Sequence, residues 1–226
     1  MDHPRVNDIL AGRATSAEEI KALTKDLKAA LSFGTARKLL GTGLALWPDD
    51  VWMRQQLALC TYKDEELPPG DRFDDALSIL EALDLRSPAN ANAETLGLAG
   101  AVYKRMWEYD GQIEHLWEAL NFYRAANARD PAADKGYGGV NAAYILDVLA
   151  ARARIGAKRA GAGPVEAEKL AAEATALRTK VEGELDDLER REPELRDQYW
   201  FGVTREVEEA GIDASHLPSA FTAAHM

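Results

Sequence analysis

The chain has 226 residues, of which 46% are hydrophobic, and a formal net charge of −11 at pH 7. This apolar fraction is large enough for an extended core and excludes a globally disordered chain. The negative charge disfavours nonspecific binding to nucleic acids and anionic membranes, which carry the same sign of charge. The single cysteine, Cys60, excludes an internal disulfide framework, and its apolar helical surroundings predict a buried structural thiol.

The predicted elements are helices throughout, because no segment alternates apolar and polar residues as a strand does. Ser16 and Glu19 form a capping box that begins the first helix, and Pro68 and Pro69 mark a loop over residues 64–70. A glycine-rich turn at 135–139 begins a helix that runs to about residue 155. In chain order the predicted helices cover 16–32, 35–47, 50–63, 72–84, 93–108, 112–129, about 139–155, 165–191 and 193–211.

One spacing pattern occurs three times along the chain. A small residue is followed by an apolar residue four positions later, by an apolar or small residue seven positions later, and by proline twelve positions later. Offsets of four and seven lie on one helix face, and proline ends the helix. A repeat of about 40 residues indicates a helical array, and these offsets match the second helix of a tetratricopeptide repeat. The three copies begin at Ala36, Ala76 and Ala119 and end at Pro48, Pro88 and Pro131.

We therefore predict an all-α, tetratricopeptide-like superhelix of about nine helices in antiparallel pairs, which is more typical of a binding scaffold than of a catalyst. The beginning of the chain, MDHPRVNDIL, lacks the basic end and apolar core of a secretion signal. No apolar run approaches the roughly 20 residues that cross a bilayer. These features predict a soluble cytoplasmic protein.

Two stretches are more specific than a generic repeat. The first is ETLGLAGAVYKRMWE at 94–108, and the second combines LNFYR at 120–124, Asp130-Pro131 and GYGGVNAA at 136–143. Together they resemble the tetratricopeptide-like regulatory region of the apoptosis signal-regulating kinases. They also resemble its bacterial relatives, the tetratricopeptide-repeat sensor or TRAFs-binding domain family. A weaker match is Tyr199-Trp200 with Thr204, and the resemblance covers about residues 35–210.

The resemblance implies a domain organisation and a function. Together with the predicted helices, it implies a repeat domain over 16–211, with a sensor-like core at about 90–210, between an amino-terminal extension (1–15) and a carboxy-terminal tail (212–226). Bacterial members of the family look like sensor modules in immune or conflict systems, where a nucleotide-derived small molecule has been proposed as the ligand. This chain contains no kinase, protease or TIR-like segment, so the effector is expected to be a separate partner protein.

The glycine-rich turn departs from the family pattern. The family often has proline and a second aromatic residue there, whereas this chain has Gly136 and Gly138. The departure predicts a looser turn. We also expect the helix that begins near Gly139 to direct free backbone N–H groups at an anion.

The repeat register predicts which side chains face the concave groove. With Gly100 at the eighth position of a first helix, Glu94 and Lys104 face the groove, and Arg105 is adjacent. A cation, an amide and aromatic rings together suit a phosphate-bearing, nucleotide-like ligand, because aromatic faces stack on bases and cations bind phosphates. The candidate ligand-binding residues are Glu94, Lys104, Arg105, Tyr137, Asn141, Tyr144, Trp200 and Arg205.

Each candidate also has a structural interpretation. Gly97 and Gly100 are typical of close helix packing, and Tyr103, Trp107 and Tyr123 of a core. Arg105 is typical of a surface salt bridge, and an amide such as Asn141 next to a glycine turn can cap the backbone.

The alternative function is a peptide- or protein-binding adaptor without a small-molecule ligand. Such an adaptor would repeat lysine and asparagine across successive first helices, whereas Gln55, Gly97 and Val140 occupy the fifth positions. An enzyme is the third alternative, and we expect none, and no cofactor. The four histidines lack metal-ligand spacing, and the chain has no phosphate-loop or serine-elbow motif.

Overall fold

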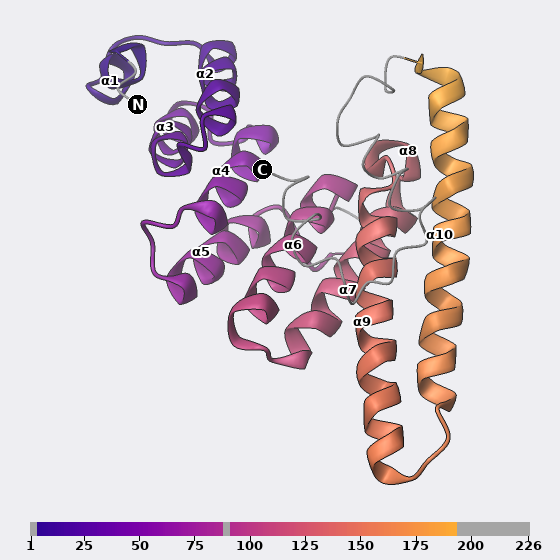
Figure 1. Cartoon of the computed structure of the whole chain (residues 1–226). Helices are drawn as coiled ribbons and strands as arrows, with labels where there is room; N and C mark the ends of the chain where they lie inside the picture. The colour runs from indigo at the N-terminus through magenta and orange to yellow at the C-terminus, as the bar shows by residue number, and fades with distance from the viewer. Residues whose placement is uncertain (1–3, 88–90, 194–226) are drawn as a thin grey trace. The chain divides into compact units, whose positions relative to one another are not determined.

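The computed structural model describes residues 4–87 and 91–193 (Figure 1). Over these residues the chain is all-α and contains no strand. It divides into two compact units, which we call the amino-terminal unit (Met1–Ala91 with Glu108–Gly111) and the carboxy-terminal unit (Asn92–Trp107 with Gln112–Met226). None of the helices described is both long and apolar enough to traverse a lipid bilayer.

In the amino-terminal unit, each helix from α2 onward packs on the next, and α1 packs on α3. The contacts run from α2 to α3, from α3 to α4 and from α4 to α5. The core includes Leu39, Leu40 and Met53, which are fully buried. The helices are α1 (Pro4–Leu10), α2 (Ala17–Ala29), α3 (Phe33–Leu46), α4 (Val51–Lys63) and α5 (Pro69–Glu81).

Helix α1 lies within the segment that the sequence analysis assigned to an extension. Its Val6 and Ile9 are buried in the same core as Ile20. The Nε and Nη2 atoms of Arg5 each donate a hydrogen bond to Glu19 at 2.6 Å, which joins α1 to α2. These bonds, with a further one from the Thr15 hydroxyl, lower the pKa of Glu19 to about 2.

The carboxy-terminal unit contains most of α6 and all of the helices after it. α7 packs on α9, and α9 forms a long antiparallel hairpin with α10 (Figure 1). The helices are α6 (Ala93–Asp110), α7 (Ile113–Arg129), α8 (Pro131–Asp134), α9 (Tyr137–Ala160) and α10 (Val165–Arg191).

The observed helices follow the predicted ones closely, with differences at the ends. α5 begins at Pro69, inside the predicted loop, because proline is tolerated in the first turn of a helix. α9 continues through Gly156 to a left-handed cap at Gly161, beyond the predicted end at residue 155. The short α8 was not predicted, and the predicted helix 193–211 lies almost wholly outside the described residues. Ala36, Ala76 and Ala119 of the repeat pattern are all fully buried.

The glycine-rich turn is tightly packed, so the expectation of a loose turn was wrong. Lys135 and Gly136 take left-handed conformations, with φ of 49° and 79°. A Cβ at Gly138 would lie 2.7 Å from the backbone oxygen of Tyr123, and one at Gly139 would lie 2.3 Å from a methyl carbon of Val181. The glycines therefore allow α9 to approach both α7 and α10 closely.

Candidate functional site

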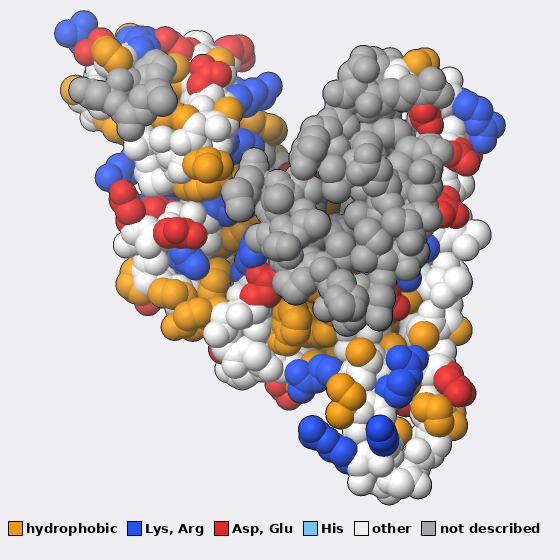
Figure 2. Space-filling view, in the orientation of Figure 1, with side chains coloured by type: hydrophobic (Ala, Val, Ile, Leu, Met, Phe, Trp, Pro, Cys, Tyr) orange, Lys and Arg blue, Asp and Glu red, His pale blue; other side chains and the backbone are white. Residues whose placement is uncertain are grey.

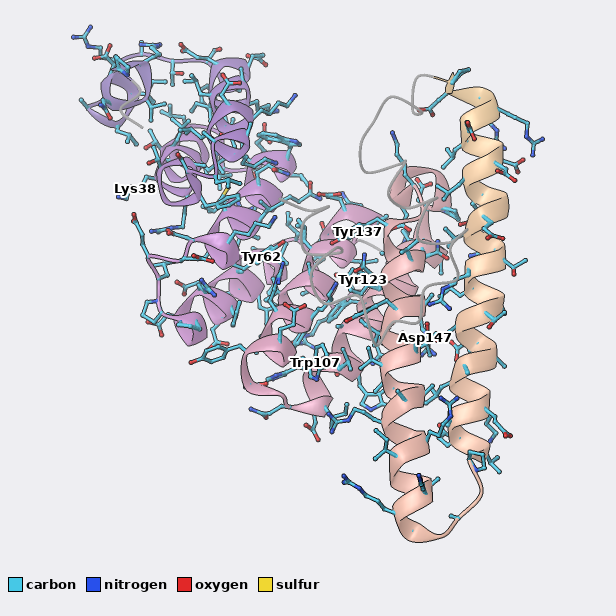
Figure 3. All side chains as sticks on the ribbon, in the orientation of Figure 1. Lys38, Tyr62, Trp107, Tyr123, Tyr137 and Asp147 are labelled. Atoms are coloured by element: carbon cyan, nitrogen blue, oxygen red, sulfur yellow. The ribbon has the colours of Figure 1, made fainter. Side chains whose placement is uncertain are left out.

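Two tyrosine rings pack on one glycine-bearing face of α6. A Cβ at Gly97 would lie 3.4 Å from the Tyr137 ring, and one at Gly100 would lie 2.9 Å from the Tyr123 ring. The two rings meet edge to face, with centroids 5.7 Å apart and an interplanar angle of 73°. Figure 3 labels both tyrosines. Gly97 and Gly100 thus serve packing between α6 and its neighbours α7 and α9.

Lys104 lies four residues after Gly100, about one helical turn further along α6, and contacts α9. Its Nζ donates a hydrogen bond of 3.1 Å to Oδ1 of Asn141 and lies 5.2 Å from the centroid of the Tyr144 ring. Asn141 is 1% exposed, and its Nδ2 donates a 2.9 Å hydrogen bond to the backbone oxygen of Tyr137. We call Lys104, Tyr137, Asn141 and Tyr144 the Lys104 cluster.

The surroundings of the Tyr137 hydroxyl keep this group neutral. Burial disfavours the phenolate and raises the pKa of Tyr137 to about 12, against a smaller opposing effect of the hydrogen bond with Tyr123. Glu94 raises this pKa further, whereas Arg105 lowers it, so both side chains act electrostatically on the Tyr137 hydroxyl. A phenol of this kind donates and accepts hydrogen bonds but does not act as a base near neutral pH.

The first turn of α9 already binds an anion from within the chain. Both carboxylate oxygens of Asp134 accept the backbone N–H of Gly138, each at 2.9 Å. Burial raises the pKa of Asp134 even though this bond and those from Asn127 and Gly139 lower it. The expectation that the beginning of this helix directs free N–H groups at an external anion was therefore wrong.

Asp134 belongs to a polar network that the sequence analysis missed. Asn127 donates to Asp134 at 3.4 Å and to Glu184 at 3.3 Å, and it accepts from Nζ of Lys180 at 2.8 Å. The network joins α7, α8 and α10 beneath the glycine turn. An acidic residue just before a glycine-rich helix start is the signal that could have indicated it.

A family model described as Tetratricopeptide Repeats-Sensor matches residues 32–146. The match begins just before α3, ends within α9 and includes the whole Lys104 cluster. The chain belongs to this sensor family. Searches of curated proteins and of solved structures return no significant match.

Membership of the Tetratricopeptide Repeats-Sensor family confirms the resemblance and the repeat fold predicted from sequence. The structure brings most of the candidate residues together on α6 and the first half of α9. Glu94 is exposed, Lys104, Arg105 and Tyr137 are partly exposed, and Asn141 and Tyr144 are buried. Trp200 and Arg205 lie outside the described residues.

Across residues 4–87 and 91–193, no three His, Cys, Asp or Glu side chains gather as a group that could hold a metal ion. Tyr123 is 1% exposed, so it is a core residue, as the structural interpretation of the sequence predicts. Tyr103 stacks on Phe122, with ring centroids 5.5 Å apart.

Proposed function

We propose that the chain is a non-catalytic sensor whose Lys104 cluster binds a small anionic, nucleotide-like molecule and thereby controls a separately encoded effector. A bacterial immune or stress-signalling system is the setting in which we expect it. The observation that carries this proposal is the position of Lys104, whose ammonium group is hydrogen-bonded to the Asn141 amide and lies 5.2 Å from the centroid of the Tyr144 ring. The family description supports the sensing role.

The chemistry of the cluster supports an anionic, aromatic ligand. The ammonium of Lys104 is a point charge for a phosphate, and tyrosine faces are stacking partners for a base. The chain carries a net charge of −11, so its overall field repels anions and a local cation is needed to bind one.

A route from binding to response follows from the hydrogen bonds of Asn141. A phosphate that binds Lys104 competes with Oδ1 of Asn141 for the ammonium. Asn141 also donates a hydrogen bond to the backbone oxygen of Tyr137 in the first turn of α9. Loss of the bond from Lys104 to Oδ1 of Asn141 therefore alters the contacts that fix this turn. In this proposal the first turn of α9 is the element that differs between the free and bound states.

The peptide-adaptor alternative receives less support. A carboxylate clamp needs polar side chains that reach the ligand from successive first helices. The fifth positions of this chain are instead buried: Gln55 and Val140 are 5% and 3% exposed, and Gly97 has no side chain.

The first test is binding to a panel of nucleotides, cyclic nucleotides and ADP-ribose derivatives, measured by calorimetry and thermal shift. We expect Lys104→Ala to weaken binding by about tenfold to over a hundredfold, since a lost charged contact costs about 1.5–3 kcal/mol. Lys169→Ala is the matched control, because Lys169 is exposed on α10 and its removal changes the net charge equally. Native mass spectrometry of freshly purified protein reports any retained small molecule.

The outcomes separate the two functions. Equal binding by the Lys104→Ala variant and the wild type would place the site elsewhere, and binding of peptides but of no nucleotide would favour the adaptor. Asn141→Ala is a structural probe, because it removes the bond to Tyr137, and we expect it to lower the melting temperature as well as affinity.

A further inference from the structure

The distal half of α9 carries an unusual concentration of positive charge. Past Ala150, the last buried residue of α9, the helix presents the exposed side chains of Arg152, Arg154, Lys158 and Arg159. None of these four forms a salt bridge with any residue that the structure describes. Between residues 148 and 170 the sequence has five cations and only two carboxylates, in a chain whose net charge is −11.

Five other cations of the carboxy-terminal unit have acidic partners. These pairs connect neighbouring helices or successive turns. They are Arg124 with Glu173, Lys135 with Glu192, Arg178 with Asp147, Lys180 with Glu184, and Arg190 with Asp187. The distal half of α9 instead concentrates four exposed cations without such pairs within residues 152–159.

An apolar stripe runs between the four cations. Val148, Ala151 and Ile155 are spaced by three and four residues, so they lie on one side of the helix. By the same geometry Arg152 and Arg159 lie on one flank of the stripe, and Arg154 and Lys158 on the other. Ile155 is 54% exposed, which is high for a large apolar side chain.

The surroundings leave this face accessible. In Figure 1 the hairpin of α9 and α10 continues past the beginning of α7, and Figure 2 shows blue and orange side chains side by side over this part of the hairpin. The family match ends at residue 146, so the face lies just beyond the matched region.

We propose that this face, which we call the α9 docking face (Val148, Ala151, Arg152, Arg154, Ile155, Lys158 and Arg159), binds an acidic amphipathic helix of the partner effector. The spacing of its apolar residues is that of one seam of a helix pair, in which flanking charges select the partner. A partner helix with apolar residues along one side and Glu or Asp beside them complements both the stripe and the charges.

Charge and shape favour a protein helix over other anionic partners. A phosphate backbone offers nothing apolar to cover Ile155. An anionic membrane would also meet Glu166 and Glu168, which are exposed at the beginning of α10. The inference rests on the proposed function only in assuming that an effector exists, and it does not require the Lys104 cluster to bind a nucleotide.

The test uses the full chain and a fluorescent synthetic peptide of three heptads. Each heptad has Leu at the two positions of the apolar seam and Glu at the two positions that flank the seam. A second peptide has the same composition with the heptad order scrambled. We expect the patterned peptide to bind at least tenfold more tightly in fluorescence anisotropy. We also expect binding to weaken as salt rises, because exposed charges are screened.

Variants locate the binding face. Arg152→Glu with Arg159→Glu, and separately Ile155→Asp, should each weaken binding of the patterned peptide at least tenfold. The matched control is Lys25→Glu with Lys38→Glu, which makes the same charge change at exposed positions of the amino-terminal unit and should leave binding unchanged. Circular dichroism checks that each variant is folded.

Four results would overturn the proposal: equal binding of both peptides, equal loss in the control variant, tighter binding to duplex DNA, or tighter binding to phosphatidylserine vesicles. The Lys104→Ala variant should bind the patterned peptide like the wild type. A protein that binds the patterned peptide but no nucleotide would therefore support the docking face and contradict the sensor site. A protein that binds a nucleotide but not the patterned peptide would support only the sensor site.

Discussion

Single glycines set the distances between helices in the carboxy-terminal unit. Gly100 faces the ring of Tyr123, Gly138 faces the backbone of the same residue, and Gly139 faces Val181. By contrast Gly156, in the same helix as Gly138, has no neighbouring atom within 4 Å of an added Cβ. The same residue type therefore has a packing role at one end of α9 and none at the other.

We predict opposite effects of alanine at the two ends of α9. Gly138→Ala should destabilise the protein by about 1–3 kcal/mol or more, because the Cβ would lie 2.7 Å from a backbone oxygen that cannot rotate away. Gly156→Ala should stabilise it by about 0.5–1 kcal/mol, because alanine loses less backbone entropy in a helix. Urea unfolding measures both, and the same sign of change at both positions would contradict the packing argument.

The thiol of Cys60 should be unreactive in the folded protein. The side chain is fully buried, and burial raises the pKa of the thiol to about 12. Because the thiolate is the reactive form, a disulfide reagent at pH 8 should label Cys60 slowly in buffer and at once in denaturant. Rapid labelling of the native protein would show that this core opens frequently.

At the scale of elements, the link between α1 and α2 makes the amino-terminal unit sensitive to acid. The folded state lowers the pKa of Glu19 from an ordinary 4.5 to about 2. Between these values the unfolded chain binds the proton more readily than the folded chain. The stabilisation is therefore fully present above about pH 4.5 and is lost as the pH falls towards 2.

Removal of Arg5 should change this pH dependence. Arg5→Met should lower stability at pH 7 and reduce the further loss between pH 4.5 and 2, since the pKa of Glu19 then returns towards its ordinary value. Arg13→Met is the control, because Arg13 pairs with Asp8 at an exposed site and such pairs contribute little. Denaturant unfolding at several pH values gives the free energy of unfolding as a function of pH for each protein. Parallel plots for Arg5→Met and the wild type would refute the link.

Helix positions were largely predictable because they depend on local patterns. The Ser16 cap accepts the N–H of Glu19 as the capping box indicates, and α10 has the predicted bounds. Helix α1 has only seven residues, too few for a periodic pattern, and its burial depends on tertiary contacts with residues such as Ile20.

The candidate site was predictable only in part. Register placed Lys104 and Asn141 on facing helices, and their side chains do meet. The role of Asp134 depends on how α8 turns into α9, which involves left-handed backbone at Lys135 and Gly136. No spacing rule in the sequence specifies that turn, so the internal anion at the beginning of α9 was missed.

At the scale of the whole molecule, the chain divides into two compact units. Ala76 of α5 and Ala119 of α7 occupy equivalent positions in the repeat pattern, one in each unit, and both are 0% exposed. A charge at either position would be buried among apolar side chains, where it is strongly unfavourable.

We predict that Ala76→Asp and Ala119→Asp each destabilise the protein by several kcal/mol, mainly in the unit that carries the change. Hydrogen exchange should show lost protection concentrated in the amino-terminal unit for the first variant and in the carboxy-terminal unit for the second. Ala125→Asp, at an exposed position of α7, is the control and should have a small effect. Unchanged melting temperatures for both buried variants would show that the repeat register is wrong.

The contact between Gly100 and Tyr123 also has an evolutionary consequence. A Cβ at position 100 would lie 2.9 Å from the ring at position 123, so a larger residue on α6 requires a smaller one on α7. Neither substitution is tolerated well alone, because one creates overlap and the other leaves a cavity. In family members these two positions should therefore covary, with alanine or serine on α6 accompanied by loss of the aromatic ring on α7.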